Sequence, residues 1–225
     1  MTTPVALWPA VTALLFVAAN WLYGRAGERA YAHPILLPSV VLMGWFSLNE
    51  EGLKAYVADT EFFRMFLAAA VVGLAVPLYR SWGAVKANKR AVLAAVAGGS
   101  IAGVMSALVP AMLLQASPEI IASLGTKSIT TPMAVTVAGS IGGVPSIAAA
   151  VVVITGLFAA LVGPGLLRAL GVDDDVATGL ALGTAGHAIG TAEAVRLSRT
   201  MGAAAAFAMT ANGLATAVLL PLVWG

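Results

Sequence analysis

The sequence predicts an all-α, polytopic membrane protein with about eight passes, two of them broken helices. Of its 225 residues, 60% are hydrophobic and 10% are charged, against about 25% charged residues in a typical soluble domain. The mean hydropathy is +0.94. Apolar runs recur from end to end of the chain, which excludes a soluble enzyme with a single anchor. Two of the runs are interrupted by polar clusters, around Lys127 and around His187.

The expected spans follow from the thickness of a bilayer, whose hydrocarbon core of ~30 Å needs roughly 20 helical residues. The N-terminal residues lack the basic flank of a signal peptide, so we interpret them as the start of the first span. The second and third spans are short for a full pass. Continuous spans are expected at 5–23, 35–49, 65–79, 91–115, 145–167 and 203–222, and broken ones at 118–143 and 176–194.

Basic residues concentrate on alternate loops of this arrangement, as expected when Lys and Arg stay on the cytoplasmic side. The pattern predicts that both chain ends lie outside. Inverted repeats of the transporter type remain open, and in that case each half would cross an odd number of times. One side holds Arg25, Arg29, Arg80, Lys86, Lys89, Arg90, Arg196 and Arg199; the other holds Lys54, Arg64, Lys127, Arg168 and the acidic run 173–175.

The first polar cluster is TKSITTP, in which a helix starting near residue 118 should stop before Pro132 and a new one should begin. The second half-helix would present free N–H groups and a positive dipole end at mid-membrane, an anion site of the kind that broken-helix transporters use. Lys127 would add a charge, and Ser128, Thr130 and Thr131 would add hydroxyl donors. The alternative is that Lys127 snorkels to the outer interface while the hydroxyls bond back to their helix.

The second polar cluster is GTAGHAIGTAEAV, which contains Thr184, His187 and Thr191 on one helical face. Glycines weaken the helix between them, so a break is expected within 186–190, where Thr191 could cap the next half-helix. His187 could bind a carboxylate or carry a proton, because an unperturbed imidazole titrates near pH 6.5. The alternative is a packed histidine that bonds a neighbouring carbonyl.

Two further polar residues have two interpretations each. Glu193 is a candidate proton carrier, but Arg196 lies only three residues away and favours an acidic group at the cytoplasmic edge. Asn212 is the strongly polar residue of the last span. An interhelical hydrogen bond explains it as well as contact with a substrate does.

Other chemistry is poorly supported. The sequence has no GxSxG, phosphate-loop or HExxH motif, and two histidines at 33 and 187 make no convincing metal site. There are no cysteines, and no basic run is dense enough for nucleic-acid binding. We therefore expect no enzyme, no cofactor and no metal. Glycine pairs at four-residue spacing, such as Gly179 and Gly183, are best explained by close helix packing.

Two long motifs resemble a known family. SPEIIASLGTKSITTPMAVTVAGSIGGVPSIAA and GLALGTAGHAIGTAEA are similar to the LrgB/CidB family of bacterial membrane proteins, whose relatives include the LrgB-like half of the plastidal glycolate/glycerate translocator. The resemblance extends to WLYGR and AVPLYRSW and implies one domain over 1–225, with N-terminal spans in 1–115 and both broken helices in 116–225. Three positions depart from the family pattern. Thr126 stands where Pro is usual, Gly186 where Ser is usual and Met201 where Glu is usual.

The resemblance implies two competing functions in the bacterial inner membrane. One is transport of a small monocarboxylate such as glycolate, glycerate, pyruvate or lactate, coupled to protons through His187 or Glu193. The other is a holin/antiholin-like regulation of murein hydrolase export and lysis, with a small LrgA/CidA-type membrane partner. A homodimer is expected in either case. The residues favour transport, because a pore-forming holin needs no Lys and His at two separate breaks; a purely structural subunit is the third hypothesis.

Overall fold

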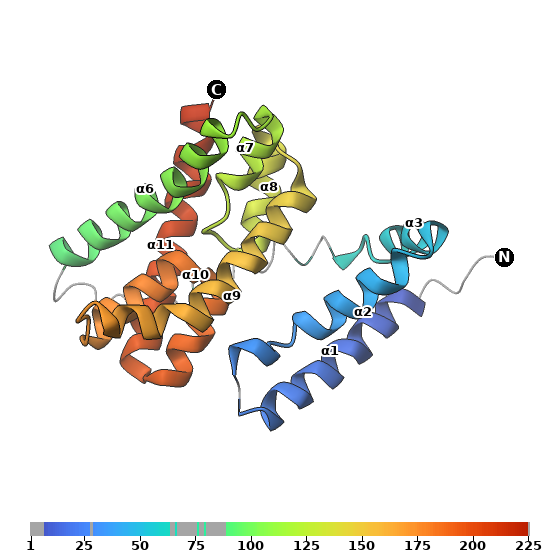
Figure 1. Cartoon of the computed structure of the whole chain (residues 1–225), viewed down its shortest axis with the longest axis horizontal. Helices are drawn as coiled ribbons and strands as arrows, with labels where there is room; N and C mark the ends of the chain where they lie inside the picture. The colour runs from blue at the N-terminus through green and yellow to red at the C-terminus, as the bar shows by residue number, and fades with distance from the viewer. Residues whose placement is uncertain are drawn as a thin grey trace. The chain divides into compact units, whose positions relative to one another are not determined.

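The computed structural model describes residues 7–27, 29–63, 66, 76, 79 and 89–224, and this part of the chain is all-helical. The all-α prediction is therefore confirmed. The expected span at 65–79 lies outside the described residues, apart from three isolated positions. The helices, drawn in Figure 1, are α1 (Leu7–Arg25), the 3-10 helix η1 (Ala30–Ala32), α2 (Leu36–Phe46), α3 (Glu50–Asp59), α6 (Lys89–Leu113), α7 (Pro118–Leu124), α8 (Thr131–Ser140), α9 (Pro145–Ala169), α10 (Asp175–Leu197) and α11 (Arg199–Trp224).

The chain divides into two compact units, residues 1–70 and 71–225. In the first unit, α1, α2 and α3 meet through an aromatic cluster of Trp8, Phe46 and Tyr56, whose ring centroids lie 5.1 to 5.9 Å apart. Such aromatic pairs bury large apolar areas and fix the approach of their helices. At 11 residues, α2 spans only ~16 Å, too short for a hydrocarbon core by itself.

Four helices of the described chain have the length and apolarity that a bilayer crossing requires: α1, α6 from Val92 onward, α9 and α11. The last three belong to the second unit. The sequence assigned the segment of α6 to the N-terminal spans, whereas the structure packs α6 against α7, α10 and α11. Both polar clusters thus share a unit with three long apolar helices.

α10 turns back on itself in the middle. His187 has φ 42° and ψ −129°, a non-helical conformation that divides α10 into two arms. The arms are antiparallel, because a Cβ at Gly190 would collide with the carbonyl oxygen of Leu182. At the base of the arms, Ser198 Oγ donates a 2.6 Å hydrogen bond to Asp175 Oδ2. We call residues 174–198 hairpin 2. The predicted break is confirmed, but the predicted pass at 176–194 is wrong, since the segment returns to the side where it began.

The segment before α9 folds in the same way. α7 ends at Leu124 and α8 begins at Thr131, so the chain breaks where Pro132 predicted. The chain returns after α8, because Ser123 Oγ, near the end of α7, accepts a 2.7 Å hydrogen bond from Val144 N, the residue before α9. We call residues 117–144 hairpin 1. The expected pass at 118–143 is therefore also a re-entrant segment.

The two hairpins enter the unit from opposite ends. The order of their contacts along α6 shows this. Near the start of α6, Val92 and Val96 pack with Leu180 of hairpin 2. A Cβ at Gly99 would meet Thr184, one at Gly103 would meet Ser128, and Leu108 contacts Gly125. Contacts along α6 thus pass from the first arm of hairpin 2 to its tip, then from the tip of hairpin 1 to the end of its first arm.

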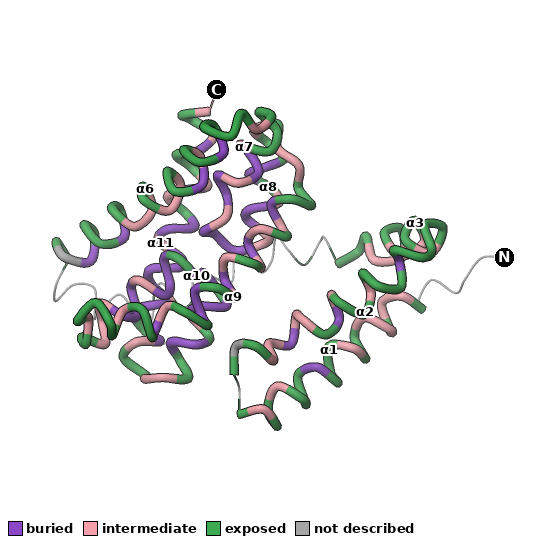
Figure 2. Tube along the Cα trace, viewed as in Figure 1, coloured by how far each residue is buried: buried purple, intermediate pink, exposed green. Residues whose placement is uncertain are grey.

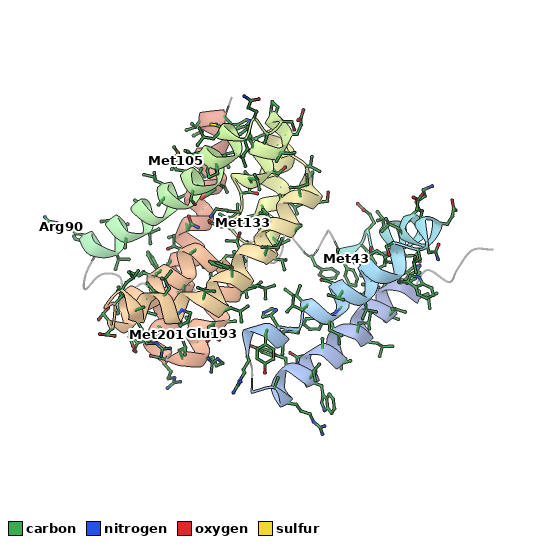
Figure 3. The ribbon with its side chains drawn as sticks, viewed as in Figure 1. Met43, Arg90, Met105, Met133, Glu193 and Met201 are labelled. Carbon is green, nitrogen blue, oxygen red and sulfur yellow. The ribbon has the colours of Figure 1, made fainter. Side chains whose placement is uncertain are left out.

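This order creates an inverted pair of elements. Hairpin 1 is followed by the long helix α9, and hairpin 2 is followed by the long helix α11, each leaving from the side at which its hairpin entered. Figure 3 shows Arg90 at the outer end of α6 and Met105 on the half nearer to hairpin 1. The tips meet near the midpoint of α6. Within the second unit, two hairpins of opposite direction are each followed by a long helix, which is the arrangement an inverted repeat would have; inverted repeats stay a prediction.

The hairpin topology also corrects the predicted sides of the charged loops. α9 ends at Ala169 and hairpin 2 starts at Asp174, so Arg168 and the acidic run 173–175 lie at the base of hairpin 2. The hydrogen bond from Ser198 to Asp175 places this acidic run beside Arg199. The sequence had placed these groups on opposite sides, because it counted 176–194 as a pass.

Glycines allow hairpin 2 and α11 to approach to backbone contact. A Cβ at Gly179 would collide with the carbonyl of Met201, and one at Gly183 with that of Ala205. This is the close packing that small residues permit in membranes. In Figure 2, buried residues gather where the two hairpins and α11 meet. The packing interpretation of this glycine pair is confirmed.

Candidate functional site

The centre of the second unit is the meeting point of the two hairpin tips, and Asn212 of α11 joins them. Its Nδ2 donates to the carbonyl of Ser128 at 2.6 Å and to the carbonyl of Thr184 at 3.1 Å. Asn212 is fully buried. Through this shared partner the two chain breaks face each other.

A break inside the protein frees backbone groups that need new partners. The helical hydrogen bonds of α10 are interrupted at His187. The carbonyl groups just before the break therefore lose the N–H donors that a continuous helix would give them. In a membrane, freed groups must be satisfied within the protein. Asn212 supplies that partner for Thr184 and, at the other tip, for Ser128.

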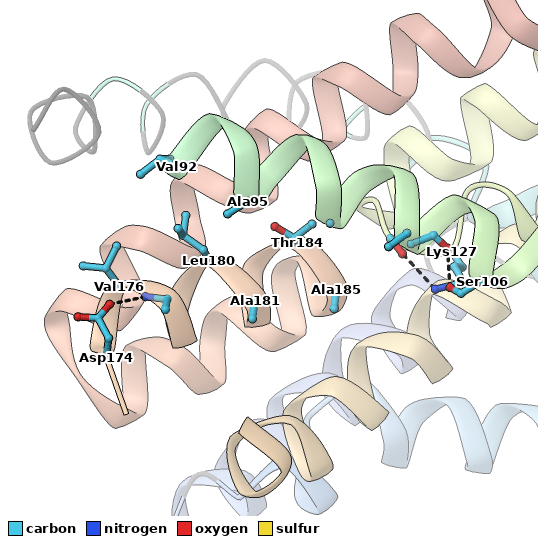
Figure 4. A pocket seen from close by; sticks show the side chains of 15 residues that line it. Val92, Ala95, Ser106, Lys127, Asp174, Val176, Leu180, Ala181, Thr184 and Ala185 are labelled. Atoms are coloured by element: carbon cyan, nitrogen blue, oxygen red, sulfur yellow. Dashed lines mark hydrogen bonds between the residues drawn. The ribbon is translucent and has the colours of Figure 1, made fainter. Parts of the chain in front are cut away.

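A cavity of about 750 Å³ lies between α6 and the first arm of hairpin 2, and it reaches the tip of hairpin 1. Figure 4 shows Lys127 and Ser106 together at one end of the cavity and Asp174 at the other. We call the end that holds Lys127, near the hairpin tips, the inner end. Most of its walls are small apolar side chains. The lining residues are Val92, Ala95, Gly99, Ala102, Gly103 and Ser106 of α6, Lys127 and Ser128 of hairpin 1, and Asp174, Val176, Ala177, Leu180, Ala181, Thr184 and Ala185 of hairpin 2.

Lys127 is the one basic side chain among the described residues that line this cavity, and it is partly buried. Its Nζ donates to Ser128 Oγ at 3.3 Å. The single acidic side chain of the described lining, Asp174, caps hairpin 2 by accepting a 2.7 Å bond from Ala177 N. A partly buried ammonium and a hydroxyl in the wall of a mostly apolar cavity can bind a small anion, because their attraction is stronger there than in bulk water.

Two glycines of α6 set the width of this inner end. A Cβ at Gly99 would lie 2.9 Å from Thr184 Cγ2, and one at Gly103 would lie 3.0 Å from Ser128 Oγ. Gly99, Gly103 and Ser106 were not predicted as site residues from the sequence. The available signal was the four-residue spacing of the two glycines inside an apolar span.

His187 lies at the tip of hairpin 2 but does not line the cavity. Its ring is buried against Gly156 of α9, and Nε2 lies 2.8 Å from the carbonyl oxygen of Val152. Because a carbonyl only accepts, Nε2 carries the hydrogen of this bond. This geometry corresponds to the packed-histidine alternative, and proton carriage by His187 stays a prediction.

The remaining hydroxyls of the first cluster lie apart from the cavity. Thr130 Oγ1 is buried without a hydrogen-bond partner among the described residues, and Thr131 is the first residue of α8. The structure thus brings Lys127, Ser128 and Thr184 together around one space, and leaves Thr130 and Thr131 outside it.

The end of the second cluster also differs from the expectation. Thr191 does not cap a half-helix, because the break falls at His187, four residues earlier. Instead its Oγ1 lies 3.7 Å from Met209 Sδ. Glu193 is buried and forms a bidentate pair with Arg196 at 2.6 and 2.9 Å, which is the pairing expected for an acidic group near the edge. Proton coupling through Glu193 stays a prediction.

Comparison with known proteins agrees with the motifs of the two hairpins. The chain is 30% identical over 213 residues to the uncharacterized protein YwbG of Bacillus subtilis (strain 168), covering 95% of this chain and 94% of that protein. It is 28% identical over 189 residues to the antiholin-like protein LrgB of Bacillus cereus (strain B4264), covering 84% and 82%. No solved structure matches. The model of the LrgB-like family matches residues 12–225, so this membrane protein belongs to the LrgB-like family.

Proposed function

We propose that this protein transports a small monocarboxylate across the bacterial inner membrane, with Lys127 as the group that binds the carboxylate. The observation that carries the proposal is the position of Lys127. It lies partly buried in the wall of a cavity, beside the point where two hairpins from opposite sides of the unit meet. An ionisable group at such a depth is costly and is by default a functional group.

The hairpin arrangement supports movement of a solute as well as binding. In transporters with inverted repeats, the site lies near mid-membrane between the repeats and is reached alternately from the two sides. Here the tips provide such a central point, and the cavity extends from it toward the base of hairpin 2. Hairpin 1 contributes Lys127 and Ser128 to the other end of this cavity.

The orientation follows from the basic residues at the base of hairpin 2. Five basic residues of the described chain lie at this end of the unit: Lys89 and Arg90 at the start of α6, Arg168 at the end of α9, and Arg196 and Arg199 beside the base of hairpin 2. The tendency of basic residues to stay inside therefore orients this end toward the cytoplasm. The cavity described here is then the cytoplasm-open side of the transport path.

The relatives favour a second candidate, antiholin-like regulation. The Bacillus cereus relative carries that description in its name, whereas the names reported above do not mention transport. Such a regulator would act with a small LrgA-type membrane partner. A transporter of weak acids can also influence lysis indirectly, so the two candidates differ in whether the purified protein moves a carboxylate by itself.

The deciding experiment is uptake into proteoliposomes of radiolabelled glycolate and pyruvate, with and without an LrgA-type partner. We expect saturable uptake that Lys127→Gln abolishes, since the substrate anion then loses its compensating charge. Lys127→Arg should restore only part of it, because a planar guanidinium differs from a compact ammonium. Lys89→Gln is the matched control, an exposed lysine of α6 outside the cavity lining.

Leakage measured in the same vesicles separates the two candidates. Release of dyes of different charge, without saturable uptake, would support a holin-like assembly and overturn the transport proposal. Saturable uptake that persists in Lys127→Gln would remove Lys127 from the site.

A further inference from the structure

Asn212, at the centre of the second unit, makes contacts with both hairpins that solute binding at Lys127 does not by itself require. It does not line the cavity, and it is fully buried behind the cavity wall. Its Nδ2 carries two hydrogens, and the structure uses one for each hairpin: Ser128 on hairpin 1 and Thr184 on hairpin 2. Its Oδ1 accepts from Thr216 Oγ1 at 3.4 Å, one turn along α11.

The residue type suits this position for a chemical reason. Two buried carbonyls must be paired, and a carboxamide nitrogen can donate to both at once. A Ser or Thr hydroxyl can donate only one hydrogen, and an ionised Asp can donate none. Leaving a buried carbonyl unpaired is costly. A single asparagine at this depth can therefore hold two chain breaks in register.

This pairing positions the groups that line the cavity. Ser128 directly follows Lys127, so fixing the carbonyl of Ser128 fixes the point from which the lysine reaches the cavity. Thr184 lines the opposite wall, on hairpin 2. Asn212 thus acts on the site through both of its walls without touching a solute.

We propose that Asn212 is a positioning residue that couples the two hairpins. Its amide holds the tips together while the cavity is open to the base of hairpin 2. Opening the path to the other side requires hairpin 1 to part from hairpin 2, and because Asn212 bonds to both, this breaks at least one of its two hydrogen bonds. The part of this inference that concerns transport rests on the proposed function, whereas the coupling of the tips does not.

The test measures the separation of the hairpins directly. The chain contains no cysteine, so cysteines introduced at Thr136 on α8 and Ala188 on hairpin 2, both exposed, can carry spin labels for pulsed EPR. In the parent protein we expect one narrow distance distribution. In Asn212→Leu, which has similar size and no donor, we expect a second, longer population.

Thr210→Val is the matched control. Thr210 is a buried residue of the same helix, and its hydroxyl bonds only to Ala206 of its own helix in the described structure, at 2.8 Å. This variant should keep the single distribution. A folded Asn212→Leu protein with the narrow distribution of the parent would overturn the proposal.

A second variant covers the case in which Asn212→Leu does not fold. Asn212→Ser keeps one donor, so it can pair one carbonyl but not both, and it should also show the longer population. An unchanged distribution in Asn212→Ser would again overturn the coupling. Rescue by Asn212→Gln, which keeps both donors on a longer side chain, should be partial.

Uptake of radiolabelled pyruvate links the coupling to transport. For Asn212→Leu we expect the maximal uptake rate per folded protein to fall about tenfold or more, since losing a buried hydrogen bond shifts an equilibrium by about that factor. Thr210→Val should stay near the parent rate. Distances that change while uptake does not would overturn the role in transport. A parent protein that moves no carboxylate would refute the proposed function, and the distances would still decide the coupling.

Discussion

Ser198 and Asp175, 23 residues apart, are joined by a 2.6 Å hydrogen bond that closes the base of hairpin 2. The bond means that the polar segment around His187 enters and leaves the unit on the same side. It changes the membrane topology, because a segment that looks like one pass in the sequence is re-entrant. Arg168, Arg196 and Arg199 consequently lie at one end of the unit.

Topology can be tested by labelling single cysteines in the cysteine-free chain. Asp173 and Thr200 are exposed and flank the base of hairpin 2. A membrane-impermeant maleimide should label cysteines at both positions from the same, cytoplasmic side. A cysteine at Glu119, at the base of hairpin 1, should react from the other side. Labelling of Asp173→Cys and Thr200→Cys from opposite sides would restore the pass predicted at 176–194.

The contact between hairpin 2 and α11 should be sensitive to one added methyl group. Gly183→Ala places a Cβ against the backbone of Ala205, which cannot move without shifting α11. Overpacking of this kind costs about 1–3 kcal/mol. Thermal unfolding in detergent should therefore occur at a lower temperature. Gly165→Ala on α9 is the control, since its Cβ meets nothing within 4 Å; equal melting temperatures for the two variants would contradict the backbone contact.

The width of the cavity should depend on one face of α6. Gly103→Ala would bring a Cβ to 3.0 Å from Ser128 Oγ, beside the bond to Lys127. We expect a higher KM for carboxylate uptake, with a larger effect for pyruvate than for the smaller glycolate. Gly98→Ala, on the same helix, adds a Cβ with no neighbour within 4 Å and should leave uptake unchanged. If both variants behave alike in concentration-dependent uptake assays, the inner end of this cavity does not hold the solute.

The pH dependence of uptake tests proton coupling and the role of His187. If a proton moves inward with the carboxylate, uptake should rise as the external pH falls, because an inward proton gradient then drives the solute. The bond between His187 and Val152 leads us to expect that His187→Gln lowers thermal stability but keeps the pH profile. A profile that becomes flat between about pH 5 and 8 would instead identify His187 as the proton carrier.

The local character of the centre could be predicted from the sequence. Pro132 and the glycines around His187 predicted both breaks. Proline lacks the N–H that a helix interior needs, and glycine without a Cβ destabilises a helix, whatever the surrounding fold. Lys127 was identified because a lone charge in an apolar run is costly regardless of the fold. The long motifs around these residues likewise identified the family.

The direction of the chain after each break was decided by tertiary structure. A broken pass and a re-entrant hairpin have the same composition and similar length, so hydropathy cannot distinguish them. The distinction depends on contacts between distant residues: Ser198 with Asp175, Ser123 with Val144, and Asn212 with both tips. Other contacts placed Lys127 in the cavity lining and the ring of His187 against Val152 of α9. The type of a residue determines what it can bind, but only the packing of the helices determines which partner lies within reach.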